Sequence, residues 1–140
     1  MKSTTGDYIV GIRDASWLAH RYANHPDHHY EIYAIGLKTQ ALPFGVVVLR
    51  RHSDGRTEWV DAVSAKSQFK WLITGLQNIT DQPIGRLFAW VSELLIPLLP
   101  PGAKVVDLNV GVPSSAWTPG PSTQTLQGKW WLMGGDTDFR

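Results

Sequence analysis

The chain has 140 residues, of which 43% are hydrophobic and 18% charged; this balance predicts one folded domain over residues 1–140 and excludes wholesale disorder. The formal net charge of +1, with the charges scattered along the chain, provides no general attraction to nucleic acid or to an anionic membrane. Because there is no cysteine, disulfide frameworks, thiolate metal sites and cysteine nucleophiles are excluded.

The sequence shows no targeting segment and no membrane-spanning segment. The first residues lack the apolar core of a secretory signal. The most apolar helical stretch, 84–99, is interrupted by Arg86 and Glu93 and is too short to span a bilayer. We therefore expect a cytoplasmic protein.

The first part of the chain predicts a strand, a helix and a second strand. Residues 8–12 form a short apolar run that is typical of a strand. Asp14 can cap a helix over residues 15–24, which ends before Pro26 because the residue preceding a proline avoids the helical region. Residues 30–37 alternate in polarity and indicate a second strand.

The clearest local pattern is a β-hairpin over residues 44–64. Two β-branched apolar runs flank a polar turn that contains Asp54 and Gly55, and Asp-Gly supplies the positive φ that tight turns require. Both arms are apolar for several residues in succession, which is typical of strands at the centre of a sheet covered by helices.

The second half predicts two helices and two further strands. Residues 68–79 have helical periodicity, although Thr74 and Gly75 weaken it, and residues 84–99 follow the helical period cleanly. A strand is predicted over 104–110, an ordered loop over 112–124 and a last strand over 126–133. The order predicts an α+β fold with a mixed, mostly antiparallel sheet, helices on both faces, and a parallel strand pair joined through the helix at 84–99.

Two local stretches resemble a known family. The first has the pattern RD…L..RY.NHP...Y..Y and begins at Arg13; the second, WWL..GDTD, begins at Trp130. With the element order, they resemble the GNAT superfamily of acyl-CoA-dependent N-acyltransferases, in particular a branch from bacterial polysaccharide-biosynthesis gene neighbourhoods. That branch often has two lobes, so the resemblance implies a GNAT-like fold as a single lobe or as the carboxy-terminal lobe of a longer protein.

The resemblance implies acetyl-CoA or another acyl-CoA as acyl donor. In this family the backbone at the end of the fourth strand positions the thioester, and a loop of the form Q/R-x-x-G-x-G/A opens a helix that binds the pyrophosphate. The corresponding cofactor-binding candidates are Val63, Ser64, Ala65, Gln82, Gly85, Arg86 and Leu87. Leu87 replaces the final small residue of the loop, and an ordinary helix start explains residues 82–87 equally well.

The resemblance also implies a catalytic base on the fourth strand, for which Glu58 and Asp61 are the candidates. Their opposite parity predicts that only one of them faces a given side of the sheet. Asp61 lies between apolar residues and is the better candidate for a perturbed pKa, with a structural, hydrogen-bonded acid as the alternative. The family's thiolate-protonating tyrosine has no counterpart in sequence order, because all four tyrosines precede the hairpin.

We expect no metal site. Four histidines fall between His20 and His29, but a solvated polar loop explains them better than zinc ligation does, and Asp136 and Asp138 are typical of a turn. In the implied branch these two acids line the substrate cleft.

Three functions stay open. The first is an acyl-CoA-dependent N-acyltransferase acting on an amine of a small molecule or sugar, which predicts an opening between the fourth and fifth strands. The second is a catalytically inactive lobe that serves as a structural or substrate-recognition module; it pairs with a second GNAT lobe or a second copy and predicts a large exposed apolar patch. The third is an unrelated α/β binding domain without a coenzyme. Neither nucleic acid nor a membrane is expected as a partner.

Overall fold

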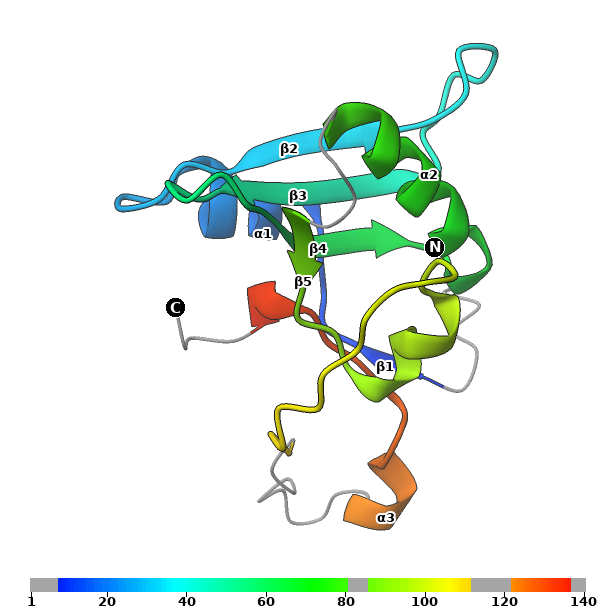
Figure 1. Ribbon diagram of the computed structural model, residues 1–140. Helices are drawn as coiled ribbons and strands as arrows, with labels where there is room; N and C mark the ends of the chain where they lie inside the picture. Colours follow the sequence, from blue (N-terminus) through cyan, green and yellow to red (C-terminus); the bar gives the residue numbers. More distant parts are fainter. Residues whose placement is uncertain (1–7, 81–85, 112–121, 137–140) are drawn as a thin grey trace.

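The computed structural model describes residues 8–80, 86–111 and 122–136, and its strands form two sheets (Figure 1). A four-stranded sheet has the order β2-β3-β4-β5, and a two-stranded sheet pairs β1 with β6. The strands are β1 Ile9–Val10, β2 Glu31–Ile35, β3 Gly45–Arg51, β4 Thr57–Ser64, β5 Leu87–Ala89 and β6 Trp130–Trp131.

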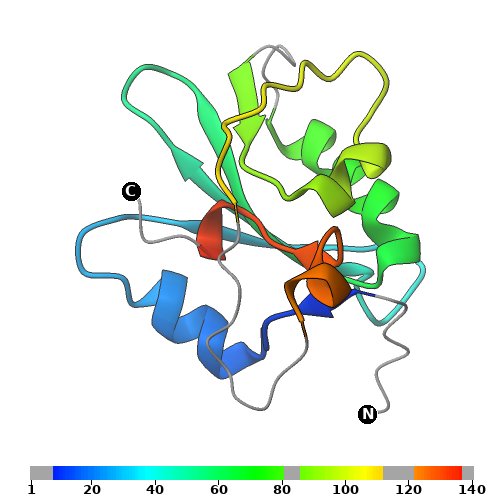
Figure 2. The same ribbon diagram turned by 90° about the horizontal axis from the view of Figure 1, so that it is seen from below.

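The helical segments lie on both faces of the larger sheet. They are α1 Ala15–Leu18, which continues into the π-helical turn η1 Ala19–Ala23, the 3₁₀ turn η2 Lys66–Gln68, α2 Phe69–Thr80, the 3₁₀ helix η4 Glu93–Leu98, α3 Thr123–Leu126 and the 3₁₀ turn η5 Gly134–Asp136. Figures 1 and 2 show α1 on one face and α2 on the other. The prediction of an α+β fold with a mixed sheet is confirmed.

The hairpin is confirmed as the centre of the sheet. β3 pairs antiparallel with both β2 and β4, while β4 pairs parallel with β5. Gly55 has φ 84° in the turn between β3 and β4, the conformation that the Asp-Gly pair predicts. The parallel pair predicted through a helix at 84–99 and a strand at 104–110 is not the one observed; β4 pairs with β5 instead, and α2 is the described helix between them.

A β-bulge interrupts β4 near its middle. Leu49 pairs with Trp59 and Val48 pairs with Asp61, so Val60 is an extra residue without a partner on β3. A bulge bends its strand and increases the local twist. The ladder between β4 and β5 covers only the three pairs before the bulge and ends at Trp59 and Ala89. The second half of β4 therefore continues without β5 beside it.

The core has two parts, one on each side of the four-stranded sheet. The larger part, on the side of α2, includes Trp59, Phe69 and Trp131, and the smaller part joins Tyr22, Val48 and Val60. Trp59 stacks on Phe69 with ring centroids 5.2 Å apart, and Phe69 meets Trp131 edge-on at 5.3 Å. Trp131 thereby ties the β1–β6 sheet to the main sheet.

Two predicted elements are wrong. In place of a helix over 84–99, residues Leu87–Ala89 form β5, and η4 follows at Glu93–Leu98 with Pro97 inside it. The apolar residues of this stretch do not form one face of an α-helix. Leu87–Ala89 pair with β4, and Leu95 is buried in the core. Residues 104–110 are not a strand, because the Asp107 side chain accepts a hydrogen bond from the Asn109 N–H at 2.7 Å and Asn109 has φ 54°. This local turn competes with strand pairing.

The other elements differ from prediction mainly in their boundaries. The helix predicted at 68–79 is α2, and the helix predicted at 15–24 is α1 with η1. The last strand is shorter than predicted, since α3 and a turn at Gly128, φ 71°, precede β6. Residues 112–121 of the predicted loop lie outside the described residues. Within the described ranges, no helix combines the length and the apolar character needed to cross a membrane.

Candidate functional site

Asp61 is the centre of a buried hydrogen-bond cluster. Its side chain is fully buried, and its carboxylate accepts bonds from Arg13 Nε at 3.0 Å and from the Tyr22 hydroxyl at 2.8 Å. The backbone N–H of Ala62 donates to the same carboxylate at 2.8 Å. Arg13 is itself buried, with only 3% of its side chain exposed. Both oxygens of Asp61 are thus occupied.

The two stretches that carry the family resemblance meet at this cluster. Arg13 and Tyr22 come from the first stretch, and Asp136 of the second accepts a hydrogen bond from Arg13 Nη2. Arg21 of the first stretch donates to the carbonyl of Gly135 at 3.0 Å. Asp136 therefore fixes η5 against the sheet as part of an ion pair, while Asp138 lies outside the described residues.

Burial raises the pKa of Asp61 above its ordinary value of 3.8. The neighbouring Asp136 carboxylate acts in the same direction, whereas the Arg13 charge and the bonds from Tyr22 and Ala62 oppose it. A carboxyl group with a raised pKa is a reasonable base in chemical terms. The donors around Asp61 argue against a role as base, because Arg13, Tyr22 and the Ala62 N–H already occupy both carboxylate oxygens that an incoming amine would have to reach.

Glu58, the other predicted catalytic carboxylate, lies in the paired half of β4 and is 5% exposed. Its carboxylate lies within hydrogen-bond distance of His52 Nε2, at 3.0 Å. The prediction that Glu58 and Asp61 face opposite sides is wrong, because the bulge breaks the alternation: Trp59 and Ala62 both join the larger core, and Asp61 points with Val60 toward Tyr22.

A pocket of about 190 Å³ lies at the carboxyl end of β4, where β5 no longer accompanies it. Its lining consists of Tyr8, Val10, Gly11, Arg13, Ala62, Val63, Ser64 and Trp131. It thus lies between the second half of β4 and the β1–β6 sheet. Two of the predicted cofactor-binding residues, Val63 and Ser64, line it, and Ala65 follows as the exposed residue that begins η2.

Trp131 lines this pocket, and its indole Nε1 is a buried polar atom. The residue is 1% exposed, and this nitrogen is the one fully buried side-chain nitrogen or oxygen without a hydrogen-bond partner among the described residues. Leaving a buried donor unsatisfied costs about 1–3 kcal/mol, so such a group calls for an explanation.

Tyr8 is a candidate that sequence order did not reveal. It precedes the hairpin by more than 30 residues in the sequence, yet it lines the pocket beside Val63 and packs on Trp131 at 5.5 Å. The Lys66 ammonium lies 6.0 Å from the centre of the Tyr8 ring. The parallel pairing of β1 with β6 brings these groups together, and the two-residue strands are too short to be recognised as a pair from the sequence.

Of the remaining cofactor-binding candidates, the two that the structure describes, Arg86 and Leu87, do not reach this pocket. Gln82 and Gly85 lie outside the described residues. Arg86 is exposed, and Leu87 pairs with Thr57 at the opposite end of β4, roughly 20 Å from Ser64 at 3.3 Å per residue. The helix that was predicted to begin in this loop and hold the pyrophosphate is absent, because β5 begins at Leu87.

No group of three or more histidine, cysteine, aspartate or glutamate side chains with metal-binding geometry occurs within residues 8–80, 86–111 and 122–136. Comparisons with protein families, curated proteins and solved structures find no match to the chain. The functional argument therefore depends on the geometry of the residues themselves.

Proposed function

We propose that this chain is a GNAT-like lobe that binds an acyl-coenzyme A beside the second half of β4 and transfers the acyl group to an amine of a small molecule or sugar. The observation that carries the proposal is the pocket at the end of β4. It lies beside the half of β4 that follows the end of the β4–β5 ladder, and Trp131 is among the residues that line it. The enzyme hypothesis predicts an opening between the fourth strand and a fifth strand at 104–110, whereas this pocket lies between β4 and the β1–β6 sheet.

In this proposal each group of the pocket has a role. The backbone of Val63, Ser64 and Ala65 holds the acyl-bearing arm, and the Trp131 ring forms the pocket wall beside it. Lys66 and the amino end of the helical segment formed by η2 and α2 face the phosphates. This segment replaces residues 82–87 as the phosphate-binding element.

The reaction needs one proton removed and one proton supplied. The amine nitrogen attacks the thioester carbonyl, the C–N bond forms, the C–S bond breaks, and the thiolate leaves. A water molecule takes the proton from the amine, because Asp61 is enclosed by its partners. The hydroxyl of Tyr8 donates a proton to the thiolate, the role for which the later part of the chain offers no tyrosine.

The first test is a thermal-shift titration with acetyl-CoA and free coenzyme A. A ligand that binds only the folded state adds about 2.7 kcal/mol at a hundred times its Kd, so binding is easily detected. Trp131→Phe should reduce the shift because the smaller ring alters the wall of the pocket. Trp71→Phe is the matched control, since Trp71 is 47% exposed on α2 and does not line the pocket. The absence of any shift would reject the coenzyme site.

Turnover is tested separately with a panel of amines and detection of the released thiol. Tyr8→Phe should lower kcat and leave acetyl-CoA binding unchanged, because the hydroxyl acts on the leaving group alone. Equal loss of binding and turnover would contradict the role given to Tyr8.

The second candidate function is the catalytically inactive lobe, and two observations favour it. The better carboxylate, Asp61, is enclosed, and apolar side chains of the segment 105–110 are exposed, with Val106 at 66% and Val110 at 70%. Coenzyme binding without turnover for any amine would support this function, and so would a stable complex with a second lobe. The unrelated binding domain predicts neither result.

A further inference from the structure

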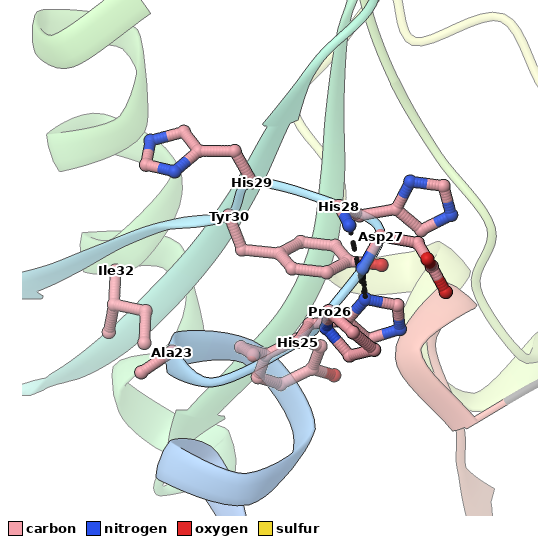
Figure 3. A pocket seen from close by; sticks show the side chains of 9 residues that line it. Ala23, His25, Pro26, Asp27, His28, His29, Tyr30 and Ile32 are labelled. Atoms are coloured by element: carbon pink, nitrogen blue, oxygen red, sulfur yellow. Dashed lines mark hydrogen bonds between the residues drawn. The ribbon is translucent and has the colours of Figure 1, made fainter.

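A second pocket, of about 500 Å³, lies between η1 and β2, and its lining includes three histidines (Figure 3). Tyr22 lines it, whereas Arg13 lines the pocket at the end of β4, and the buried Asp61 is bonded to both. The buried cluster therefore separates the two pockets. A ligand of the histidine pocket is distinct from the acyl-CoA, and its existence does not depend on the proposed acyl transfer.

The hydrogen bonds show which ring nitrogen carries the proton in neutral His25 and His28. His25 Nδ1 accepts from the backbone N–H groups of Asp27 at 3.2 Å and His28 at 3.1 Å. His28 Nδ1 lies 3.2 Å from Arg50 Nη2, and an arginine can only donate. Both Nδ1 atoms are thus acceptors, and each neutral ring carries its proton on Nε2.

This tautomer decides the kind of ligand. A metal ion requires an unprotonated ring nitrogen, and both Nδ1 atoms are already occupied while both Nε2 atoms carry a proton. The rings instead offer two N–H donors. The two rings stack at a centroid separation of 5.0 Å with an interplanar angle of 18°, so both donors belong to one pair of neighbouring rings. Arg50, which donates to His28, strengthens the N–H on the far side of that ring.

Tyr30 holds the pair of rings in place. It meets His25 at 5.5 Å and His28 at 6.2 Å, in both cases edge-on. Figure 3 shows the His29 ring turned away from these two, so His29 lines the pocket without joining the donor pair. Asp27 is the carboxylate of the lining; it is exposed, and it opposes an anion.

We propose that the pocket between η1 and β2 binds an oxyanion of the phosphate class through the Nε2–H groups of His25 and His28. The experiment titrates the folded protein with inorganic phosphate at pH 7.5 and constant ionic strength, and it follows the imidazole nitrogens by long-range ¹H–¹⁵N correlation. The spectra should show the proton on Nε2 in both rings. Both Nε2 signals should also shift on addition of phosphate and reach saturation by about 20 mM, because a weak site has a Kd in the millimolar range.

The variants give the proposal its sharpest test. His28→Phe keeps a flat ring for stacking and removes the donor, so the phosphate response should be lost, whereas His29→Phe should leave it unchanged. Asp27→Asn removes a negative charge from the pocket lining and should tighten phosphate binding about fivefold. This is the factor that repulsion between a carboxylate and an anion about 4 Å apart gives in water.

Four results would overturn the proposal: a proton on Nδ1 of either ring, an equal response to chloride, a response that survives in His28→Phe, or weaker binding in Asp27→Asn. The melting temperature of each variant is measured first. Should His28→Phe not fold, His28→Gln and the tautomer assignment of the wild-type protein decide the question.

Discussion

At the scale of single residues, Gly135 shows how closely the buried cluster is packed. A Cβ built on Gly135 would lie 1.9 Å from the Tyr22 hydroxyl oxygen and 3.2 Å from Asp61 Oδ2. No side chain fits there without displacing the tyrosine from its hydrogen bond with Asp61. The glycine of the GDTD stretch is therefore required by the close approach of η5 to the cluster.

Gly135→Ala should lower the free energy of unfolding by about 1–3 kcal/mol, the usual cost of overpacking. The matched control is Gly111→Ala, because no atom of the described residues lies within 4 Å of a Cβ at Gly111. Urea denaturation of the two variants and the wild type measures the difference. Equal stability of the two variants would contradict the packing described for η5.

Asp61 should give stability a specific dependence on pH. Its pKa is raised by burial from 3.8, so between that value and the folded-state pKa the native protein binds more protons than the unfolded chain. The contribution of Asp61 to the free energy of unfolding is therefore fully present below pH 3.8. It is lost as the pH rises from 3.8 through the raised pKa of the folded state.

The measurement is urea denaturation of the wild type and Asp61→Asn from pH 4 to pH 7. Asparagine cannot titrate, so the stability of the wild type relative to the variant should fall as pH rises. Asp61→Asn also loses the ion pair with Arg13, which changes the free energy of unfolding of the variant. Because asparagine does not titrate, this change does not itself vary with the protonation of residue 61. A relative stability that rises with pH would show that the Arg13 charge outweighs burial.

At the scale of elements, α2 shows why local propensity was a poor guide. Thr74 and Gly75 weaken the helix in isolation, yet α2 is continuous from Phe69 to Thr80. A Cβ at Gly75 would lie 2.5 Å from Ile35 Cγ2, so the glycine lets the helix approach β2 closely. Packing of the apolar face compensates for the intrinsic cost of glycine, about 1 kcal/mol.

Gly75→Ala should destabilise the protein despite the higher helix propensity of alanine. The expected loss in the free energy of unfolding is about 1–2 kcal/mol. Ile35→Ala in the same background should recover part of it, and a double-mutant cycle over the two positions measures that coupling. A stabilised Gly75→Ala variant would mean that α2 lies farther from β2.

The hairpin and α2 were predictable because each depends on neighbours in sequence: a turn dipeptide between apolar arms, or a helical period. The bulge at Val60 was not, because one extra residue leaves the apolar run unchanged. The helix predicted at 84–99 was wrong because periodicity does not reveal a three-residue strand that pairs with β4. Errors therefore concentrate where tertiary pairing overrides a local pattern.

At the scale of the whole molecule, the candidate site depends on contacts between distant parts of the chain. Arg13 and Asp136 are separated by 123 residues and meet in one ion pair, and Tyr8 reaches the pocket of Val63 through the pairing of β1 with β6. The sequence identified both stretches and Asp61 as candidates, but not that they form one buried cluster. It offered Asp61 either as a catalytic base or as a structural, hydrogen-bonded acid, and the bonds from Arg13 and Tyr22 are those of a hydrogen-bonded acid.

The apolar side chains of segment 104–110 lie on the surface and not in the core, and substitutions can test this placement. The sequence pattern predicts a strand, which would bury alternate side chains, but Val106 is 66% exposed. Val106→Lys should therefore change the free energy of unfolding by less than about 0.5 kcal/mol, as for other surface positions. Val47→Lys, the same change at a fully buried residue of β3, should prevent folding.

Both variants are compared with the wild type by chemical denaturation and by sedimentation velocity. An unaffected Val106→Lys monomer would agree with a chain that leaves this segment available to a partner, as the inactive-lobe function requires. A loss above about 2 kcal/mol is the size expected for a polar group forced into a core. That result would place 104–110 inside the sheet of the folded protein, because only a buried position penalises the lysine so strongly.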